Sequence, residues 1–396
     1  MKVDGRAVHL QVHGQRLAIS SEIPGFADYV ETAMQAFVCP AGGRPDVESH
    51  LEWVEGPRAR SLPEAFGTNS WQRRPDRDLY IDGNTAFWLR IDDFLDLHIK
   101  AVWEDGVVRL TGRYYFSIGT SPRTEWLHRL RHRGRLDILR AHRFSTLLYY
   151  LVYHPLLWRL SRFEGWHVVH GGAVSDGRRA VVLAGMPGCG KSTLAVALAG
   201  RPGWKMLSDN LLLFNASSVM ACPELLLLDP GSIARAGQGA ARLTPTGESR
   251  VFGRHAYRPA EMELFPVEPG TILVVERGRR SSVRELTPEL CRDRMRAGST
   301  MAKEVRRIAI MGQVLDEIAG TSAPDELADL GRLVAMLSKD FRPKGTLLRI
   351  VFTAGILPHH AHAFNPVLVM PRQQGGPRRH APSAYVGGGK TYAIGG

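Results

Sequence analysis

The sequence predicts an α/β protein in which a phosphate-binding domain follows a β-rich N-terminal domain and a helical connector. Apolar and polar residues alternate in short runs before residue 120, residues 121–163 are mainly helical in pattern, and strands alternate with helices from residue 164. The chain has 396 residues, more than one hydrophobic core usually holds, so more than one domain is expected.

Residues 1–120 are predicted to form a β-rich accessory or recognition domain. Strand-like segments such as AVHLQVHGQRLAIS alternate with turns, two of which are the pairs Asp82-Gly83 and Asp105-Gly106. A short helix is expected in residues 31–43, ending at Pro40, and residues 55–78 are expected to form a surface loop. This part of the sequence offers no combination of catalytic side chains.

Residues 121–163 are predicted to be a helical connector. Its first half is rich in arginine, in a chain whose formal net charge is +12. We favour a solvated or interdomain face for these arginines over a nucleic-acid surface, because no aromatic residues are interleaved with them. The apolar run Leu147–Trp158 is too short to span a membrane and is interrupted by His154 and Pro155, so core packing is expected.

Residues 164–345 contain the most informative motif, GMPGCGKST, which lies between the apolar run Ala180–Ala184 and the helix-like KSTLAVALAG. A glycine-rich loop between a strand and a helix wraps phosphates with its backbone N–H groups. Lys191 would reach the β- and γ-phosphates of ATP, and the Ser192 hydroxyl would join the shell of Mg²⁺. A helix N-terminus could lower the pKa of the Cys189 thiol and make it reactive. The favoured interpretation is that Cys189 is a small residue that fits the loop. The predicted nucleotide-binding residues are Gly185, Met186, Pro187, Gly188, Cys189, Gly190, Lys191, Ser192 and Thr193.

Such a loop needs an acidic partner, and Asp209, Asp229 and Glu276 each follow an apolar run. Asp209 is favoured because it follows Lys191 by 18 residues, enough for one helix, a turn and the strand WKMLSDNLLLF. Each carboxylate has the alternative role of capping a turn. WHVVHGGAV is expected to form a hairpin with RAVVLAG, which places His170 beside the strand that feeds the loop and His167 nearer the loop itself.

These residues resemble bacterial HPr kinase/phosphorylase, and more closely the HPr-kinase-related proteins. The matching segments are HPLLWRLSRFEGWHVVHGGAV, GMPGCGKSTLAVALA and WKMLSDNLLLF, and the resemblance covers roughly residues 147–280. It implies a P-loop kinase domain that transfers the γ-phosphate of ATP to a hydroxyl of a protein or small-molecule acceptor. It also implies that Asp209 is the base and a Mg²⁺ partner, and that His170 positions phosphate or acceptor.

Three features keep alternatives open. Asn210 stands where the family has a second acidic residue, which favours a non-catalytic ATP-binding regulator as the alternative. His170 has the alternative role of a buried histidine satisfied by the backbone. The basic segment 241–263 is either a loop that closes over the triphosphate or an ordinary solvated loop.

The rest of the sequence indicates the cellular location, the partners and the character of the C-terminal tail. Four widely spaced cysteines and an N-terminus without the apolar core of a secretion signal favour a reducing, cytoplasmic location. Expected partners are ATP and an unknown phosphoacceptor, with self-association left open and neither nucleic acid nor a membrane span expected. The Gly- and Pro-rich residues 346–396 are expected to be a disordered tail.

Overall fold

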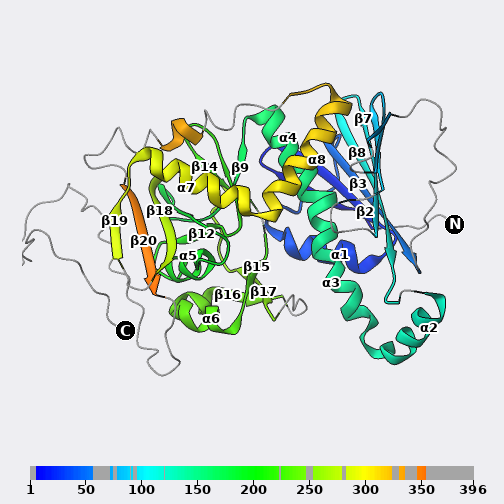
Figure 1. Cartoon of the computed structure of the whole chain (residues 1–396), viewed down its shortest axis with the longest axis horizontal. Helices are drawn as coiled ribbons and strands as arrows, with labels where there is room; N and C mark the ends of the chain where they lie inside the picture. Colours follow the sequence, from blue (N-terminus) through cyan, green and yellow to red (C-terminus); the bar gives the residue numbers. More distant parts are fainter. Residues whose placement is uncertain are drawn as a thin grey trace, which may run out of the picture.

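The computed structural model describes residues 6–56, 72–74, 78–89, 91, 96–119, 121–222, 224–246, 253–278, 282–322, 330–334 and 346–353. It is a mixed α/β structure, as the sequence predicts, and the described residues form one sheet of eight strands, one of six and two of three. Figure 1 shows the large sheet and the six-stranded sheet at opposite ends of the molecule, with helices between and around them. The predicted tail beyond residue 353 lies outside the described residues.

The large sheet is built by the N-terminal part of the chain, which confirms the predicted β-rich character. The two predicted Asp-Gly turns are present, with Gly83 and Gly106 at φ of 55° and 79°, and they join tight antiparallel pairs. Within the predicted loop 55–78, a short strand pairs at the sheet edge, while 57–71 and 75–77 lie outside the described residues. In sheet order the strands are β1 (Val8–Val12), β2 (Gln15–Ser21), β3 (Val47–Glu55), β8 (Val107–Phe116), β7 (Leu97–Glu104), β6 (Thr85–Trp88), β5 (Leu79–Asp82) and β4 (Gln72–Arg74).

Helices cover one face of this sheet. The first helix begins before the predicted segment 31–43, because Pro24 fits its first turn, and only a short 3-10 turn reaches Phe37. The helical character predicted for residues 121–163 is confirmed, and the chain widens into a π-helical turn just before Pro155, which has no N–H to donate. The elements are α1 (Pro24–Ala33), η1 (Gln35–Phe37), α2 (Pro122–Arg131), η2 (Arg133–Arg135), α3 (Leu136–Leu148), η3 (Tyr149–Tyr153) and α4 (His154–Glu164).

The six-stranded sheet carries a helix on each face. Alternate residues of β11 and β18 point to opposite faces: Val181 and Leu183 pack with α5, whereas Val182 and Ala184 pack with α7. The strands β11, β18 and β20 run parallel. In order the strands are β12 (Lys205–Ser208), β10 (Gly172–Ser175), β11 (Arg179–Ala184), β18 (Glu268–Gly278), β20 (Thr346–Thr353) and β19 (Ser282–Glu285), with α5 (Lys191–Ala199) and α7 (Pro288–Met301).

Two sequence expectations about this region need correction. Residues 346–353, predicted to belong to the tail, form β20, which pairs with β18 and β19. Part of the predicted loop 241–263 forms the antiparallel pair β16 (Leu243–Pro245) and β17 (His255–Pro259), which pairs in turn with β15 (Leu226–Leu228). Residues 247–252 lie outside the described residues. Between β15 and β16 the chain forms α6 (Pro230–Ala236) and the 3-10 helix η4 (Gly237–Arg242).

Two segments predicted to be single strands are each broken in the middle. The first divides at Gly171 into β9 (His167–His170) and β10, and the second divides at Asp209-Asn210 into β12 and β13 (Leu211–Phe214). The two breaks lie side by side, since Gly171 N donates to Asn210 O at 3.1 Å. A Cβ atom on Gly172 would lie 3.0 Å from Asp209 O, so glycine permits this close approach.

Beyond the breaks, β9 and β13 join β14 (Val219–Ala221) in a small sheet that is buried on both faces. One set of alternating residues packs into the core of the N-terminal half, and the other set packs into the core beneath α7. The residues facing the N-terminal core are Val168, Leu211, Leu213, Met220 and Cys222, and those facing the other core are Val169, Leu212, Phe214, Val219 and Ala221. The small sheet therefore separates two cores.

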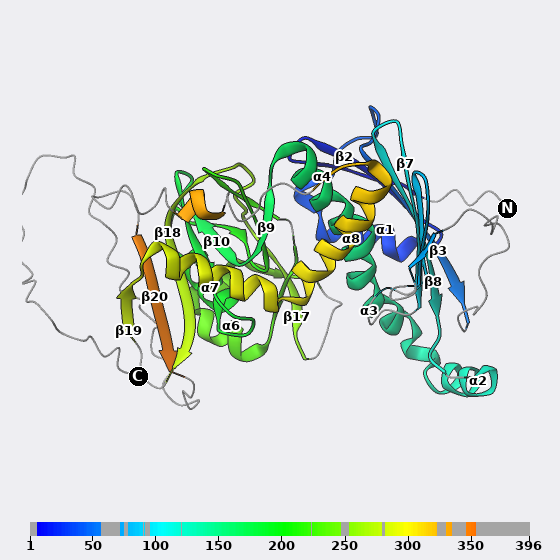
Figure 2. The ribbon, with the colours of Figure 1, turned by 45° about the horizontal axis from the view of Figure 1, so that its top comes forward.

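Helix α8 (Lys303–Ala319) returns the chain to the N-terminal half. Met311, Val314 and Leu315 pack into the N-terminal core, and Asp316 accepts hydrogen bonds from Arg162 at 2.6 Å and from Trp158 at 2.8 Å. Figure 2 shows α8 lying beside α4. Among the residues described, none of the helices combines the length and the apolar character needed to cross a membrane.

Candidate functional site

The glycine-rich loop runs from the end of β11 at Ala184 to the start of α5 at Lys191, as predicted. Gly185, Gly188 and Gly190 have φ values of 131°, 77° and 106°, a region that side chains other than glycine rarely adopt. A Cβ atom on Gly185 would lie 2.3 Å from Val275 O, and one on Gly298 would lie 2.8 Å from Gly185 O. The first residue of the loop is thus packed between β18 and α7.

Lys191 is buried, and its amine is held inside the loop. Its Nζ atom donates to Gly185 O at 2.9 Å and Met186 O at 3.1 Å, and it lies 2.9 Å from Nε2 of His170. Burial lowers the pKa of Lys191, while Cys189 and Asp209 oppose this shift. The amine is therefore already positioned at the loop before any ligand contacts it.

His170 reaches Lys191 from the end of β9, and its backbone N donates to Ser299 Oγ at 3.0 Å. Burial, and next the charge of Lys191, lower the pKa of His170 to about 4, so the ring is neutral at pH 7. Because Nε2 accepts from the lysine, the proton of the neutral ring lies on Nδ1. That atom is buried, and hydrogen bonds between His170 and Asn210 oppose the lowering of the pKa.

Asp209 lies in the turn between β12 and β13 and is buried beside the start of α5. Burial raises its pKa, whereas a hydrogen bond with the Ser192 side chain and the charges of Lys191 and Arg254 lower it. Its Oδ1 atom is buried without a hydrogen-bond partner among the described residues. Lys191, His170, Ser192 and Asp209 therefore meet at one place.

This donor set fits a magnesium ion that arrives with a nucleotide. No group of three or more metal-ligating His, Cys, Asp or Glu side chains occurs in the part of the chain that the structure describes. Mg²⁺ typically takes only one or two protein carboxylates and fills its octahedron with phosphate oxygens and water. An orphaned oxygen on Asp209 next to a serine hydroxyl matches that requirement.

The other two predicted carboxylates have different partners. Asp229 caps α6, accepting from Ser232 N at 2.8 Å and from Ser232 Oγ at 2.7 Å. Glu276 lies near the end of β18 and pairs with Arg294 at 3.4 Å. Of the three, Asp209 is the one with a hydrogen bond to Ser192.

Sequence reasoning missed a buried polar network behind Asp209. Glu224 accepts from the Tyr149 hydroxyl and from Leu211 N, the latter at 2.9 Å, and Asn210 Nδ2 donates to the Tyr149 hydroxyl at 3.4 Å. Tyr149 begins the π-helical turn, so the network connects the helical connector to the break that holds Asp209. The only trace of it in the sequence is one acidic residue next to the apolar run LLLL.

Burial, and next the charge of Asp209, raise the pKa of Glu224 to about 8, so its side chain is protonated at pH 7. The unfolded chain loses that proton near pH 4.5. Between these values the folded state binds one more proton, so the free energy of unfolding falls as pH rises, by up to about 1.4 kcal/mol per pH unit. The stabilisation by protonated Glu224 is fully present below the pKa of the unfolded state, and it is lost as the pH rises through the pKa of the folded state.

We expect Glu224→Gln to remove this contribution to the pH dependence of stability. Urea unfolding of wild type and variant between pH 5 and 9 measures it, and the difference between their unfolding free energies should change through this window and level off above about pH 8. Glu263→Gln, at another buried glutamate outside the network, is the matched control. A constant difference between wild type and Glu224→Gln would contradict the assignment.

His167 is not near the loop, which corrects the predicted register. The ring of His167 packs on Phe214 with centroids 5.3 Å apart, in the small sheet. The expected hairpin is interrupted at Gly171, so His170 and not His167 reaches the lysine.

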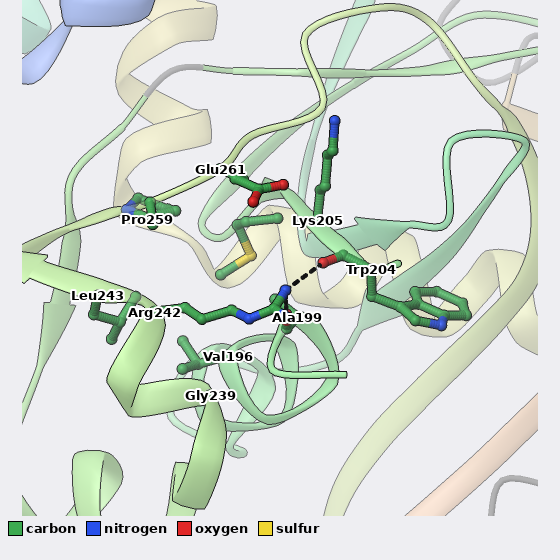
Figure 3. A pocket seen from close by; sticks show the side chains of 11 residues that line it. Val196, Ala199, Trp204, Lys205, Gly239, Arg242, Leu243, Pro259 and Glu261 are labelled. Atoms are coloured by element: carbon green, nitrogen blue, oxygen red, sulfur yellow. Dashed lines mark hydrogen bonds between the residues drawn. The ribbon is translucent and has the colours of Figure 1, made fainter. Parts of the chain in front are cut away.

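A pocket lies at the far end of α5, where Arg242 donates to the carbonyl of Trp204 at 3.3 Å (Figure 3). Val196 and Ala199 of α5 line it, and none of the predicted site residues does. The nine residues of α5 span about 13 Å, so this pocket is roughly a helix length from the glycine-rich loop.

Comparison with known proteins gives neither a matching family model nor a matching curated protein. The fold and site define an α/β protein with a glycine-rich loop between a parallel strand and a helix, beside a buried lysine, histidine and aspartate.

Proposed function

We propose that the protein is an ATP-dependent phosphotransferase of the HPr-kinase-related class, which passes the γ-phosphate of ATP to a hydroxyl of a protein or small-molecule acceptor. The observation that carries the proposal is the convergence of Lys191, His170 and the Ser192–Asp209 pair from separate elements onto one junction. The proposal includes the P-loop kinase fold and a cytoplasmic location.

The loop and its lysine would bind the triphosphate. Backbone N–H groups of the loop and the N-terminus of α5 favour phosphate, and Lys191 would exchange its carbonyl contacts for β- and γ-phosphate oxygens. Ser192 and Asp209 would hold Mg²⁺, which supplies positive charge to the phosphates. Arg254, whose charge reaches Asp209, would add a further cation at this edge.

In the transfer step the acceptor oxygen forms a bond to the γ-phosphorus while the bond from that phosphorus to the β–γ bridging oxygen breaks. ADP leaves with that oxygen, and the acceptor proton passes to a carboxylate oxygen of Asp209. A pKa raised by burial suits this base. The His170 ring, which lies 2.9 Å from the Lys191 amine, would orient a phosphate or acceptor oxygen.

A second candidate is a non-catalytic protein that binds ATP as a regulatory ligand. It is favoured by Asn210, which is neutral and already engaged, since its carbonyl accepts from Gly171 N and its side chain donates to Tyr149. Asp209 would then have no second ionised carboxylate beside it, because Glu224 is protonated at pH 7.

The experiment incubates purified protein with Mg²⁺ and ATP labelled in the γ-phosphate, with and without lysate of the source cells, and measures ATP binding in parallel. We expect label on a component of the lysate and ADP in equal amount. ATP binding without any labelled acceptor supports the regulatory candidate instead. Absence of ATP binding contradicts both.

A further inference from the structure

Helix α2 stands apart from the body of the molecule, beyond the end of β8 (Figures 1 and 2). Residues on one side of α2 make its contacts with the rest of the molecule. Buried Glu125 accepts from Ile118 N at 2.8 Å and Gly119 N at 2.6 Å, and Arg129 pairs with Glu125 and with Glu55, each at 2.6 Å. Because residues four apart lie on the same side of a helix, these contacts fix which side faces the sheet.

The opposite side of α2 exposes large apolar residues. Trp126, Leu127 and Leu130 are 64%, 54% and 58% exposed. At 100° per residue Leu127 and Leu130 lie on the arc turned away from Glu125 and Arg129, and Trp126 lies at the edge of that arc. Ile138, in the first turns of α3, is 53% exposed and extends this surface. A cluster of such residues on a projecting element is a mark of an interaction site.

The rim of this surface is basic. Arg123 and Arg131 are exposed on the same arc, and Arg133 follows in the next turn. Of the nearby acidic groups, Glu125 is buried under its own hydrogen bonds, and Asp137 is paired with Arg140 at 2.8 Å. The α2 surface is defined as Trp126, Leu127, Leu130 and Ile138 with Arg123, Arg131 and Arg133. It therefore combines apolar side chains with arginines that form no ion pair among the described residues.

We propose that the α2 surface docks the protein onto a membrane that contains anionic phospholipid. Tryptophan prefers the headgroup level, leucines enter the acyl boundary, and arginines pair with lipid phosphates. The surface is carried on a projecting helix, which can enter a deformable bilayer without a complementary groove. The Glu125 and Arg129 contacts already order the helix, so docking costs little conformational entropy.

The test is sedimentation of the whole protein with vesicles of phosphatidylcholine alone or mixed with phosphatidylserine. We expect binding to the mixed vesicles, weakened by salt, and little binding to phosphatidylcholine alone. The double variant Leu127→Ser, Leu130→Ser should bind more than tenfold more weakly, although its charge is unchanged. Arg123→Gln should weaken binding to mixed vesicles about fivefold.

Phe265→Ser is the matched control, because Phe265 is 75% exposed and lies outside the α2 surface. It should bind vesicles as wild type does, and thermal melting should show all variants folded. Equal binding by wild type and the double leucine variant would overturn the proposal, as would no binding to mixed vesicles at low salt. A third outcome would also overturn the proposal: wild type does not bind vesicles, but it binds a protein from the lysate that the double leucine variant does not bind. The α2 surface would then be assigned to a protein partner.

Discussion

We expect replacement of Lys191 by alanine to reduce the proposed phosphate transfer to background, a loss of at least about a hundredfold in kcat/KM. The amine is the buried cation of the loop, and the structure holds it against Gly185 O and Met186 O, where bound phosphates would meet it. Without it, the loop amides must bind the triphosphate unaided, so ATP binding weakens as well. Transfer of labelled γ-phosphate and equilibrium binding of ATP measure the two effects.

Lys205→Ala is the control for Lys191→Ala, because Lys205 is an exposed lysine on β12 at the α5 pocket. It should transfer phosphate as wild type does. Since Lys191 is buried, thermal melting must show that Lys191→Ala is folded before its activity is compared. Undiminished transfer in a folded Lys191→Ala protein is incompatible with the proposed site.

We expect replacement of Asp209 by asparagine to lower the proposed transfer at least about a hundredfold, because the variant would lose both the proposed proton acceptor and the proposed anionic Mg²⁺ ligand. Asparagine has nearly the same shape and still accepts a hydrogen bond from Ser192, so the fold should be retained. Binding of ATP measured without Mg²⁺ should change little, whereas the gain in affinity on adding Mg²⁺ should shrink.

Asp229→Asn is the matched control for Asp209→Asn. Asp229 caps α6, and asparagine caps a helix about as well, so neither stability nor transfer should change. Glu276→Gln tests the remaining candidate carboxylate, which pairs with Arg294. Transfer that survives in Asp209→Asn but is lost in Glu276→Gln would move the metal ligand to Glu276.

Local patterns were enough to predict the class of the fold, the loop and the flanking strand and helix. The breaks at Gly171 and at Asp209-Asn210 were not predictable in this way, because apolar residues flank each of them on both sides and the break is imposed by the neighbouring strand. Glu224 was missed for a similar reason. Its burial depends on Tyr149, 75 residues earlier, and no local pattern records that contact.

The sheet formed by β9, β13 and β14 has a consequence for how the two halves of this chain can change. This sheet is apolar on both faces, so removal of either half of the chain would expose one apolar face to water. The C-terminal half is thus not an interchangeable module. Any replacement of the N-terminal half has to preserve its packing against Val168, Leu211, Leu213 and Met220. A mutation in the core of the N-terminal half therefore also affects β9, the strand that carries His170.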